Sequence, residues 1–218
     1  MKYYQKEVRK IISVSIRLSS DFSCQQDSII SSLPFGEIEK SRLSSIKNPT
    51  YKSQSLATLV ALNDILPTSA SDLTILRTSN NKPYFNQSIL KFSLSHAGKL
   101  SVAVLGDIPV GIDIELLDKS KDTSKLISRF FNDEEKEVLQ NSSDTALTFY
   151  SMWTKKEALS KISGEGLSSV SKQNSISGFS RQYVLNLQNE TYIMSVCAAK
   201  SDTVTINNAF KELTIYEL

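Results

Sequence analysis

Twice along this 218-residue chain, a segment with helical periodicity precedes segments that alternate as β-strands do. The first predicted helix spans residues 55–66 and stops before Pro67, while the second spans residues 145–163 and stops before Gly164. Strand-like alternation then follows each helix. This repeated order predicts an α+β protein of two lobes with a cleft between them.

The last third of the chain contains three short segments in which apolar and polar residues alternate. They lie at residues 183–187, 192–196 and 213–216. Period-two alternation is typical of strands that bury one face. We therefore expect these segments to form a second sheet.

Residues 101–115 are predicted to form a β-hairpin whose turn is Gly106 to Pro109. Alternation along residues 110–115 places Asp113 and Glu115 side by side on one face of the second strand. Together with Glu157 from the second helix, they would supply the oxygen ligands that magnesium prefers. The pattern alone fits the solvated face of a half-exposed strand equally well.

Overall composition excludes several classes of function. The 25 basic and 23 acidic residues give a charge of +2, too balanced for sequence-independent nucleic-acid binding. The single histidine excludes a zinc cage built from several imidazoles. Neither a CxxC pair nor an apolar run long enough to span a bilayer is present. We expect a cytoplasmic protein that binds neither nucleic acid nor membrane.

Five side chains have both a structural and a functional interpretation. Glu135 stands three residues after Asn132, the spacing of a capping box at the start of a helix. Glu157 and Lys161 are four residues apart and could form an ordinary ion pair on a helix face. His96 follows Ser95 at the end of a predicted strand and precedes Ala97-Gly98, and Lys82 precedes Pro83. Each of the two could contact a phosphate or simply be a structural or surface residue.

Read in order, five blocks of the sequence resemble the 4'-phosphopantetheinyl transferases of the surfactin-synthetase-activating type. The blocks are KP at 82–83, FSLSHAG at 92–98, GIDIE at 111–115, FFNDEE at 130–135, and WTKKEALSK at 153–161 with Gly164, Gly166 and Leu167. The resemblance covers about residues 82–167 directly. Because the five blocks occur in the same order as in that family, the resemblance is more specific than any single motif.

The resemblance implies two pseudo-symmetric halves, each a small, mostly antiparallel sheet packed with a long helix, with the active site in the cleft between them. Residues 1–108 would form the half that contacts the nucleotide of coenzyme A. Residues 109–218 would form the half that carries magnesium and the catalytic residues. The implied reaction moves the phosphopantetheine arm of coenzyme A onto a serine of an acyl or peptidyl carrier protein.

The resemblance also implies roles for individual acids. Asp113, Glu115 and Glu157 would hold magnesium at the pyrophosphate of coenzyme A, and Glu157 would thereby take part in catalysis. Glu135 would be the general base for the carrier serine, and Glu134 would replace it if the register shifts by one residue.

Basic and hydroxyl side chains are implied to bind coenzyme A. Lys161 would stabilise the charge that develops as the phosphoanhydride breaks. His96 would contact a phosphate, and Ser95 and Lys82 would help to seat the nucleotide end. Lys52 is our choice for the 3'-phosphate.

The chain departs from the family pattern at the nucleotide end. Asn81 stands where a glycine usually precedes the Lys-Pro pair, although asparagine tolerates a left-handed backbone. The basic residues for the 3'-phosphate are hard to align, and Arg42 and Lys47 are candidates beside Lys52.

Two other functions would use the same residues. A metal-dependent phosphohydrolase acting on coenzyme A or a related nucleotide would need the same acids and lysine, with water in place of the carrier serine. A non-catalytic module could bind a carrier protein or coenzyme A without turnover. Because one chain would complete the cleft, a monomer is expected in each case.

Overall fold

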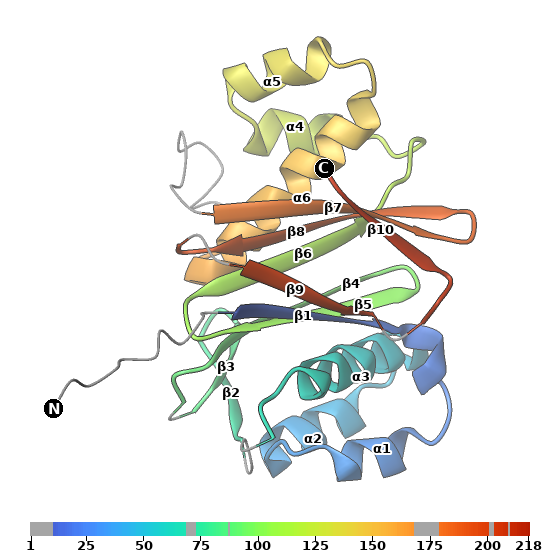
Figure 1. Ribbon diagram of the computed structural model, residues 1–218, viewed down its shortest axis with the longest axis vertical. Coiled ribbons are helices and arrows are strands. Elements are labelled where there is room, and N and C mark those ends of the chain that lie inside the picture. Colours follow the sequence, from blue (N-terminus) through green and yellow to red (C-terminus); the bar gives the residue numbers. More distant parts are fainter. Residues whose placement is uncertain (1–10, 69–72, 87, 168–178, 201–202, 209) are drawn as a thin grey trace, which may run out of the picture.

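The computed structural model describes residues 11–68, 73–86, 88–167, 179–200, 203–208 and 210–218 (Figure 1). Its helices are the 3-10 helix Ser19–Phe22, α1 Gln26–Ser32, α2 Glu37–Ser45, α3 Pro49–Asp64, α4 Ser124–Phe130, α5 Asp133–Gln140 and α6 Thr145–Ser163. Its strands are β1 Ile11–Leu18, β2 Ile75–Arg77, β3 Pro83–Phe85, β4 Lys91–Ala97, β5 Leu100–Gly106, β6 Val110–Leu116, β7 Phe179–Leu187, β8 Glu190–Ala198, β9 Thr203–Asn208 and β10 Leu213–Glu217. The predicted α+β class is confirmed.

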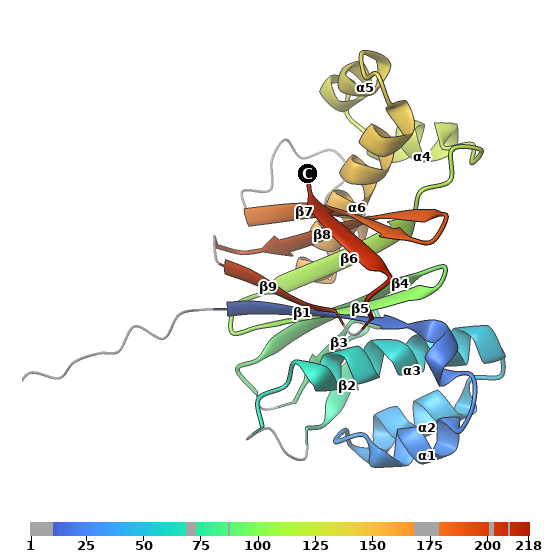
Figure 2. The same cartoon turned by 45° about the vertical axis from the view of Figure 1, so that its right-hand side comes forward.

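The molecule is built from two sheets back to back, with helices on both outer faces (Figures 1 and 2). One sheet has the strand order β4-β5-β1-β9 and is covered by α3, with α1 and α2 on the far side of that helix. The other has the order β10-β7-β8-β6 and is covered by α6. Between the sheets lies an apolar core that includes Val14 and Val102 from the first and Ile112 and Met194 from the second. Each half thus pairs a small sheet with one long helix, as predicted.

The predicted hairpin at residues 101–115 is wrong. Both strands exist, but β5 pairs with β1 and β4, whereas β6 pairs antiparallel with β8. The chain passes from one sheet to the other between Gly106 and Val110. Alternation is a property of a single strand and does not identify its partner. The connection that resembled a hairpin turn therefore joins two different sheets.

The two halves share one sheet, because β9 from the C-terminal half lies parallel to β1 from the N-terminal half. Residues 11–16 pair in register with residues 203–208. The proposed boundary near residue 108 falls at the crossing from β5 to β6, and the division into two domains stays a prediction. The predicted second sheet is confirmed, since β7, β8 and β10 pair with one another and with β6.

Both long helices begin with a side-chain cap, which is Asn48 in α3 and Asp144 in α6. For α3, the Asn48 side chain accepts the Tyr51 amide, and Pro49 occupies the first turn, so this helix begins six residues before the predicted start at Ser55. For α6, Gly164 follows the helix with a positive φ of 76°, a backbone conformation that glycine adopts at little cost.

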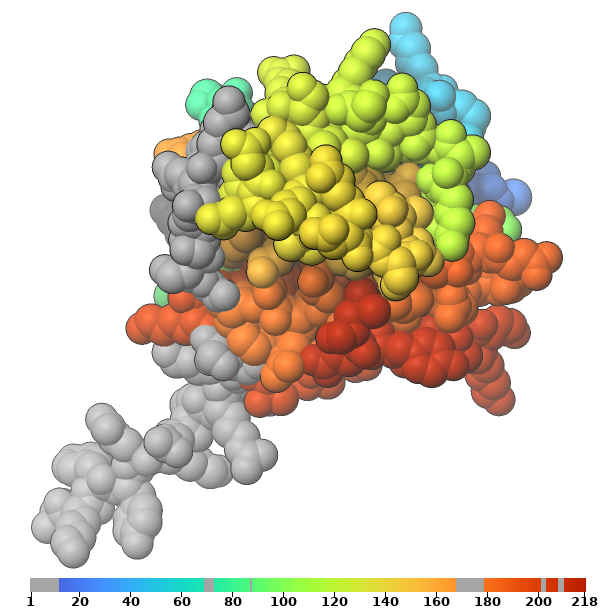
Figure 3. All heavy atoms as spheres, turned by 90° about the horizontal axis from the view of Figure 1, so that it is seen from above, coloured from blue at the N-terminus to red at the C-terminus, as the bar shows by residue number. Residues whose placement is uncertain are grey.

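Helices α4, α5 and the first turns of α6 form a cap at one end of the molecule (Figure 3). Asn132 and Glu135 make the predicted capping box at the start of α5, with each side chain bound to the other's backbone amide. Phe131, Phe149 and Trp153 stack beneath this cap. Among the described residues, no helix is both long and apolar enough to cross a bilayer.

Candidate functional site

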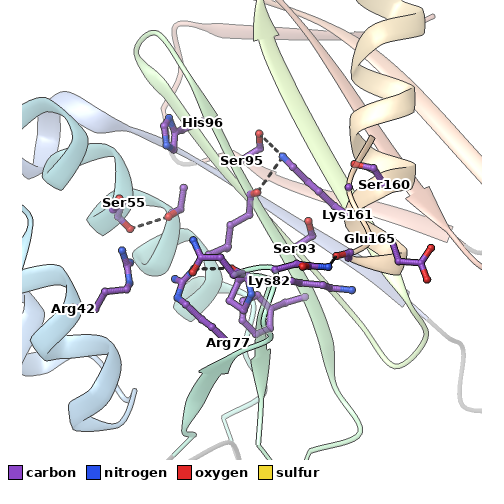
Figure 4. A pocket seen from close by; sticks show the side chains of 18 of the residues that line it. Arg42, Ser55, Arg77, Lys82, Ser93, Ser95, His96, Ser160, Lys161 and Glu165 are labelled. Atoms are coloured by element: carbon purple, nitrogen blue, oxygen red, sulfur yellow. Dashed lines mark hydrogen bonds between the residues drawn. The ribbon is translucent and has the colours of Figure 1, made fainter. Parts of the chain in front are cut away.

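A cavity of about 620 Å³ lies between the N-terminal half and the end of α6 (Figure 4). Residues of α2, α3, the β2–β3 hairpin and β4 line most of it, and residues 160–166 close the remaining side. Of the predicted site residues, Lys82, Ser95, His96 and Lys161 line this cavity. The structure therefore brings together four side chains that are spread over 80 residues of sequence.

Lys161 occupies the seam between the two sheets. β4 and β6 are edge strands of different sheets, and the Lys161 ammonium donates to the carbonyl of Leu94 on the first (3.4 Å) and of Ile112 on the second (3.1 Å). It also binds Ser95 Oγ at 2.9 Å and Asp113 Oδ1 at 2.7 Å. The ion pair of Lys161 is thus with Asp113, and not the helix-face pair with Glu157 that its spacing could have indicated.

The carboxylate of Asp113 is buried beneath this lysine. Its Oδ1 accepts hydrogen bonds from Lys161 and from Ser95, the latter at 2.8 Å. Its Oδ2 is buried and, among the described residues, has no hydrogen-bond partner. A buried acceptor of this kind is costly unless a further group binds it. One oxygen of Asp113 therefore remains available for a ligand.

The other two predicted metal ligands lie within electrostatic reach of Asp113. Burial, followed by the Asp113 charge, raises the pKa of Glu157 to about 7. The same two causes raise the pKa of Glu115, although the charge of Lys121 opposes them. The face of β6 that bears Asp113 packs against α6, since a Cβ at Gly111 would lie 1.9 Å from the Ala158 carbonyl oxygen. The solvated-face alternative is therefore wrong for Asp113.

The negative charges of Asp113, Glu115 and Glu157 suit a divalent cation, although the three carboxylates are not grouped closely enough to form a preformed metal site. In the part of the chain that the structure describes, no three Asp, Glu, His or Cys side chains are grouped so as to hold a metal ion. Magnesium commonly takes only one or two protein carboxylates and completes its shell with water and substrate phosphate. The open Oδ2 of Asp113, and the burial and Asp113 charge that raise the pKa of Glu157, are compatible with such a site.

His96 sits at the end of β4 on the wall of the cavity. Burial, followed by the charge of Lys161, lowers its pKa, while Asp113 opposes the shift. Its ring meets Tyr51 of α3 edge to face, with 5.7 Å between centroids. A neutral imidazole can donate one hydrogen bond and accept another, and a nearby phosphate would favour its protonated form.

Lys82 lines the cavity but is held at the end of α6. Its ammonium donates to the Ile162 carbonyl at 2.6 Å, where the helix leaves acceptors unpaired. Asn80 reinforces the contact by donating to the Gly164 carbonyl at 3.0 Å. Burial, followed by the charge of Lys91, lowers the pKa of Lys82. Asn81 has a positive φ of 63°, as expected for an asparagine in the place of glycine.

Besides the three acids Asp113, Glu115 and Glu157, two more predicted residues do not line the cavity. Lys52 of α3 pairs with Asp27 at 3.3 Å and does not line the cavity, whereas Arg42 of α2 does. Glu135 is fully engaged at the cap, where Oε2 accepts the Asn132 amide at 2.9 Å and Oε1 pairs with the buried Lys156 at 2.7 Å. Its capping role is confirmed, and its role as a base stays a prediction, as does that of the exposed Glu134.

Sequence reasoning missed two residues at the opposite end of the cavity. Arg77 of β2 lines it beside Arg42, and the buried Glu39 of α2 binds both guanidinium groups. The three-residue spacing of Glu39 and Arg42 is a helical signal for their pair. Nothing in the local sequence connects either residue to Arg77, because that contact depends on how the β2–β3 hairpin packs on α2.

Comparison with known proteins gives one family profile and several curated relatives. A profile described as the 4'-phosphopantetheinyl transferase superfamily (ACPS) matches residues 109–205. The chain is 38% identical over 92 residues to 4'-phosphopantetheinyl transferase psf-1 of Bacillus pumilus, covering 41% of this chain and 39% of that protein. It is 38% identical over 86 residues to 4'-phosphopantetheinyl transferase HetI of Nostoc sp., covering 38% of this chain and 36% of that protein. It is 36% identical over 80 residues to 4'-phosphopantetheinyl transferase Sfp of Bacillus subtilis, covering 35% of this chain and 34% of that protein. The chain thus spans less than half the length of these curated relatives.

Proposed function

Because residues 109–205 match the 4'-phosphopantetheinyl transferase superfamily and the chain resembles several of its curated members over part of its length, we propose that it transfers the 4'-phosphopantetheine arm of coenzyme A to a serine of a carrier protein. The carrier would be an acyl or peptidyl carrier of fatty-acid, polyketide or nonribosomal-peptide synthesis. The serine oxygen forms a bond to the phosphorus that carries the arm. The phosphoanhydride bond breaks, and adenosine 3',5'-bisphosphate leaves.

The observation that carries the proposal is the position of Lys161. Its ammonium lies on the wall of the large cavity and is fixed by Asp113, Ser95 and two main-chain carbonyls. Phosphoryl transfer depends on positioning and on neutralising charge more than on covalent help. A cation fixed in this way can stabilise the charge on the breaking phosphoanhydride without reorganising.

The other cavity residues have roles that follow from their chemistry. His96 donates a hydrogen bond to a phosphate of coenzyme A, and Ser95 orients both Lys161 and Asp113. Lys82 holds the end of α6 and thereby sets the cavity wall that faces the nucleotide. Lys52 is retained as a contact to the 3'-phosphate at the outer edge of the site, where it must exchange Asp27 for the ligand.

Asp113, Glu115 and Glu157 would hold magnesium, with the unpaired Asp113 Oδ2 as the first ligand. When bound, the ion would neutralise the pyrophosphate charge as its bonds rearrange. Without it, Glu157 is protonated up to about pH 7 because burial and Asp113 raise its pKa. Its deprotonation therefore accompanies binding of a cation.

Glu135 would accept the proton of the carrier serine. To do so it must exchange one of its contacts, to the Asn132 amide or to Lys156, for the serine hydroxyl. Approach of the carrier to the α4–α5 cap could provide that exchange. We place the reaction in the cytoplasm and assign it to a monomer, in agreement with two unpaired cysteines and a cavity completed by one chain.

The test is to incubate the purified protein with coenzyme A, magnesium and an unmodified carrier protein, and to weigh the carrier by intact mass spectrometry. We expect a gain equal to the phosphopantetheine arm, which is lost with Glu157→Ala or a chelator. Glu212→Ala, which removes an exposed acid outside the site, should leave the gain unchanged.

The other outcomes distinguish the alternatives. Coenzyme A cleaved without any carrier would identify a metal-dependent phosphohydrolase. Coenzyme A bound but left intact, across acyl, peptidyl and aryl carriers, would identify a non-catalytic binding module.

A further inference from the structure

A row of three polar side chains lies on the face of the second sheet that α6 covers (Figure 1). Gln182 of β7 pairs in register with Ser195 of β8, which pairs in turn with Asp113 of β6. Residues directly opposite each other on neighbouring antiparallel strands point to the same face, so the three side chains form one line beneath the helix. Lys161 binds one end of this line through Asp113. The rest of the line binds α6 through groups that the proposed reaction does not use.

These groups form a chain of hydrogen bonds whose direction is set by its ends. Gln182 Nε2 donates to the Ser151 carbonyl at 2.6 Å and to Ser195 Oγ at 2.9 Å. The Thr154 hydroxyl donates to the Tyr150 carbonyl at 2.9 Å, because a carbonyl can only accept. A hydroxyl has one hydrogen, so Ser195 must donate to Thr154, whose oxygen lies 2.7 Å away. One polar chain therefore runs from β7 through β8 into α6.

This chain requires one particular position of the helix. Thr154 and Ser195 are fully buried, so a shift of α6 that separated them would leave two hydroxyls without partners and without water, which is destabilising. The apolar contacts nearby, such as Leu159 with Cys197, have no preferred direction and tolerate small displacements. The hydrogen bonds therefore set the register of α6 on the sheet more strictly than the apolar contacts do.

The same helix carries two residues of the proposed reaction. Glu157 and Lys161 follow Thr154 by three and seven residues, the spacing of one helical face. The Lys161 ammonium has four acceptors within 3.4 Å, and they come from the edge strands of both sheets. A misplacement of about 1 Å at a reacting group can cost about 10²-fold in rate. The rate should therefore depend on the register of α6.

We infer that Thr154 is a positioning residue for the transfer. Together with Ser195 and Gln182, it fixes α6 in the register that holds Glu157 and Lys161 at Asp113. The inference rests on the proposed function, because the register controls the rate of that reaction. Neither Thr154 nor Ser195 belongs to the cavity lining that the structure describes, so both act through the helix.

The experiment removes one hydroxyl and compares the effect on kcat with that on KM for coenzyme A. Thr154→Val keeps the shape of the side chain but can neither donate nor accept. It should lower kcat at least about tenfold, because the reacting groups are displaced, and leave KM within about threefold. Thr154→Ser keeps the hydroxyl and should restore kcat to within about threefold of wild type.

Thr148→Val is the matched control. Thr148 is a threonine of the same helix, but its hydroxyl bonds to Ser142 of the preceding loop at 2.6 Å and not to the sheet. Its removal also deletes one hydroxyl contact, so any general effect of such a loss appears in both variants. Thr148→Val should leave kcat unchanged.

Trp153 provides a measurement that needs no substrate. It is the only tryptophan of the chain, precedes Thr154 directly, and meets Phe130 of α4 edge to face with 5.6 Å between centroids. A displaced α6 alters this contact. Thr154→Val should therefore shift the fluorescence emission maximum and the near-UV circular dichroism of Trp153, whereas Thr154→Ser and Thr148→Val should not.

A second substitution separates position from stability. Thr154→Val leaves the Ser195 hydroxyl unpaired and should lower the midpoint of thermal unfolding by about 2–6 °C. Combined with Ser195→Ala, it removes both hydroxyls and should regain part of that loss, while kcat stays low because the bond between helix and sheet is still absent. Ser195→Ala alone breaks the same chain from the sheet and should also lower kcat.

Two results would overturn the inference. One is a kcat that recovers in the double variant together with the unfolding midpoint, which would make Thr154 a purely structural residue. The other is a Thr154→Val protein with the kcat and the Trp153 emission of wild type. If wild type transfers no arm to any carrier, the proposed function itself fails, and the Trp153 emission still decides whether the polar chain sets the register of α6.

Discussion

One wall of the cavity comes from the C-terminal half of the chain and the other from the N-terminal half. The function of the first can be predicted from sequence more readily than that of the second. The C-terminal wall carries Lys161 above Asp113, and the family profile matches residues 109–205 around them. The N-terminal wall, with Arg42, Arg77 and His96, lies outside that matched range, yet it supplies most of the lining.

This difference teaches that reaction and recognition are built in different ways. The proposed metal ligands and Lys161 are a compact set on two elements, β6 and α6, which sequence spacing can describe. The recognition end is gathered from α2, α3, β2 and β4 and is fixed by packing. If the division is real, substitutions on the two walls should change different measured quantities.

The largest expected effect is on the C-terminal wall. Lys161→Met should lower the rate of transfer at least about 10²-fold, because it removes the cation proposed to stabilise the breaking bond. It should also lower the free energy of unfolding by about 3 kcal/mol, since Asp113 is left buried without its partner. Single-turnover kinetics and urea unfolding measure the two quantities.

Lys155→Met is the matched control, because Lys155 is an exposed lysine of the same helix. An equal loss of rate in both variants would mean that the charge of the helix, and not the seam between the sheets, sets the rate.

The next prediction separates the structural role of Glu135 at the start of α5 from its proposed role as a base. Glu135→Gln should lower kcat about 10²-fold if the carboxylate accepts the serine proton, while glutamine can still close the capping box. Lys156→Met should lower the free energy of unfolding by about 1–2 kcal/mol, because the pair is partly exposed. It should keep kcat within a few fold of wild type. Equal rate losses in the two variants would reduce Glu135 to a structural residue.

A smaller effect concerns the pH dependence of the metal-free protein. The folded protein holds the Glu157 pKa at about 7, above its ordinary value of 4.5. The folded state then binds more protons than the unfolded chain between these values, so the free energy of unfolding falls as pH rises through this window and levels off above it. Glu157→Gln should remove about 1–2 kcal/mol of that fall, a figure reduced from the full shift because the side chain is only partly buried.

The measurement is urea unfolding of both proteins in chelator at pH 5, 6, 7 and 8. Parallel curves for wild type and Glu157→Gln would show that the acids of the C-terminal wall do not interact as described.

The smallest effect lies where one wall supports the other. The Tyr192 hydroxyl of β8 accepts a hydrogen bond from the Lys99 backbone amide at 3.2 Å and donates one to Glu190 Oε2 at 2.6 Å. The C-terminal half therefore holds the turn that follows His96. Tyr192→Phe should cost about 1 kcal/mol of unfolding free energy and raise KM for coenzyme A more than it changes kcat. A change confined to kcat would place this contact with the reacting wall.

Sequence reasoning succeeded where a pattern acts within one element. It predicted the capping box of α5, the end of α6 at Gly164 and the placement of Asp113 and Glu115 on one face of β6. It failed where the answer depends on which elements meet. The β5–β6 hairpin was wrong because pairing is decided between strands, and Arg77 was missed because its partner Glu39 lies 38 residues away.

The pairing of β1 with β9 has a consequence for how the protein is made. Residues 11–16 bind residues 203–208, so a ribosome has added nearly two hundred residues before the first sheet receives its last strand. At a synthesis rate of about 5–20 residues per second, β1 waits roughly 10–40 seconds with one edge unpaired. Exposed strand edges recruit other strands, so production at low temperature or with a chaperone should favour the yield of folded protein.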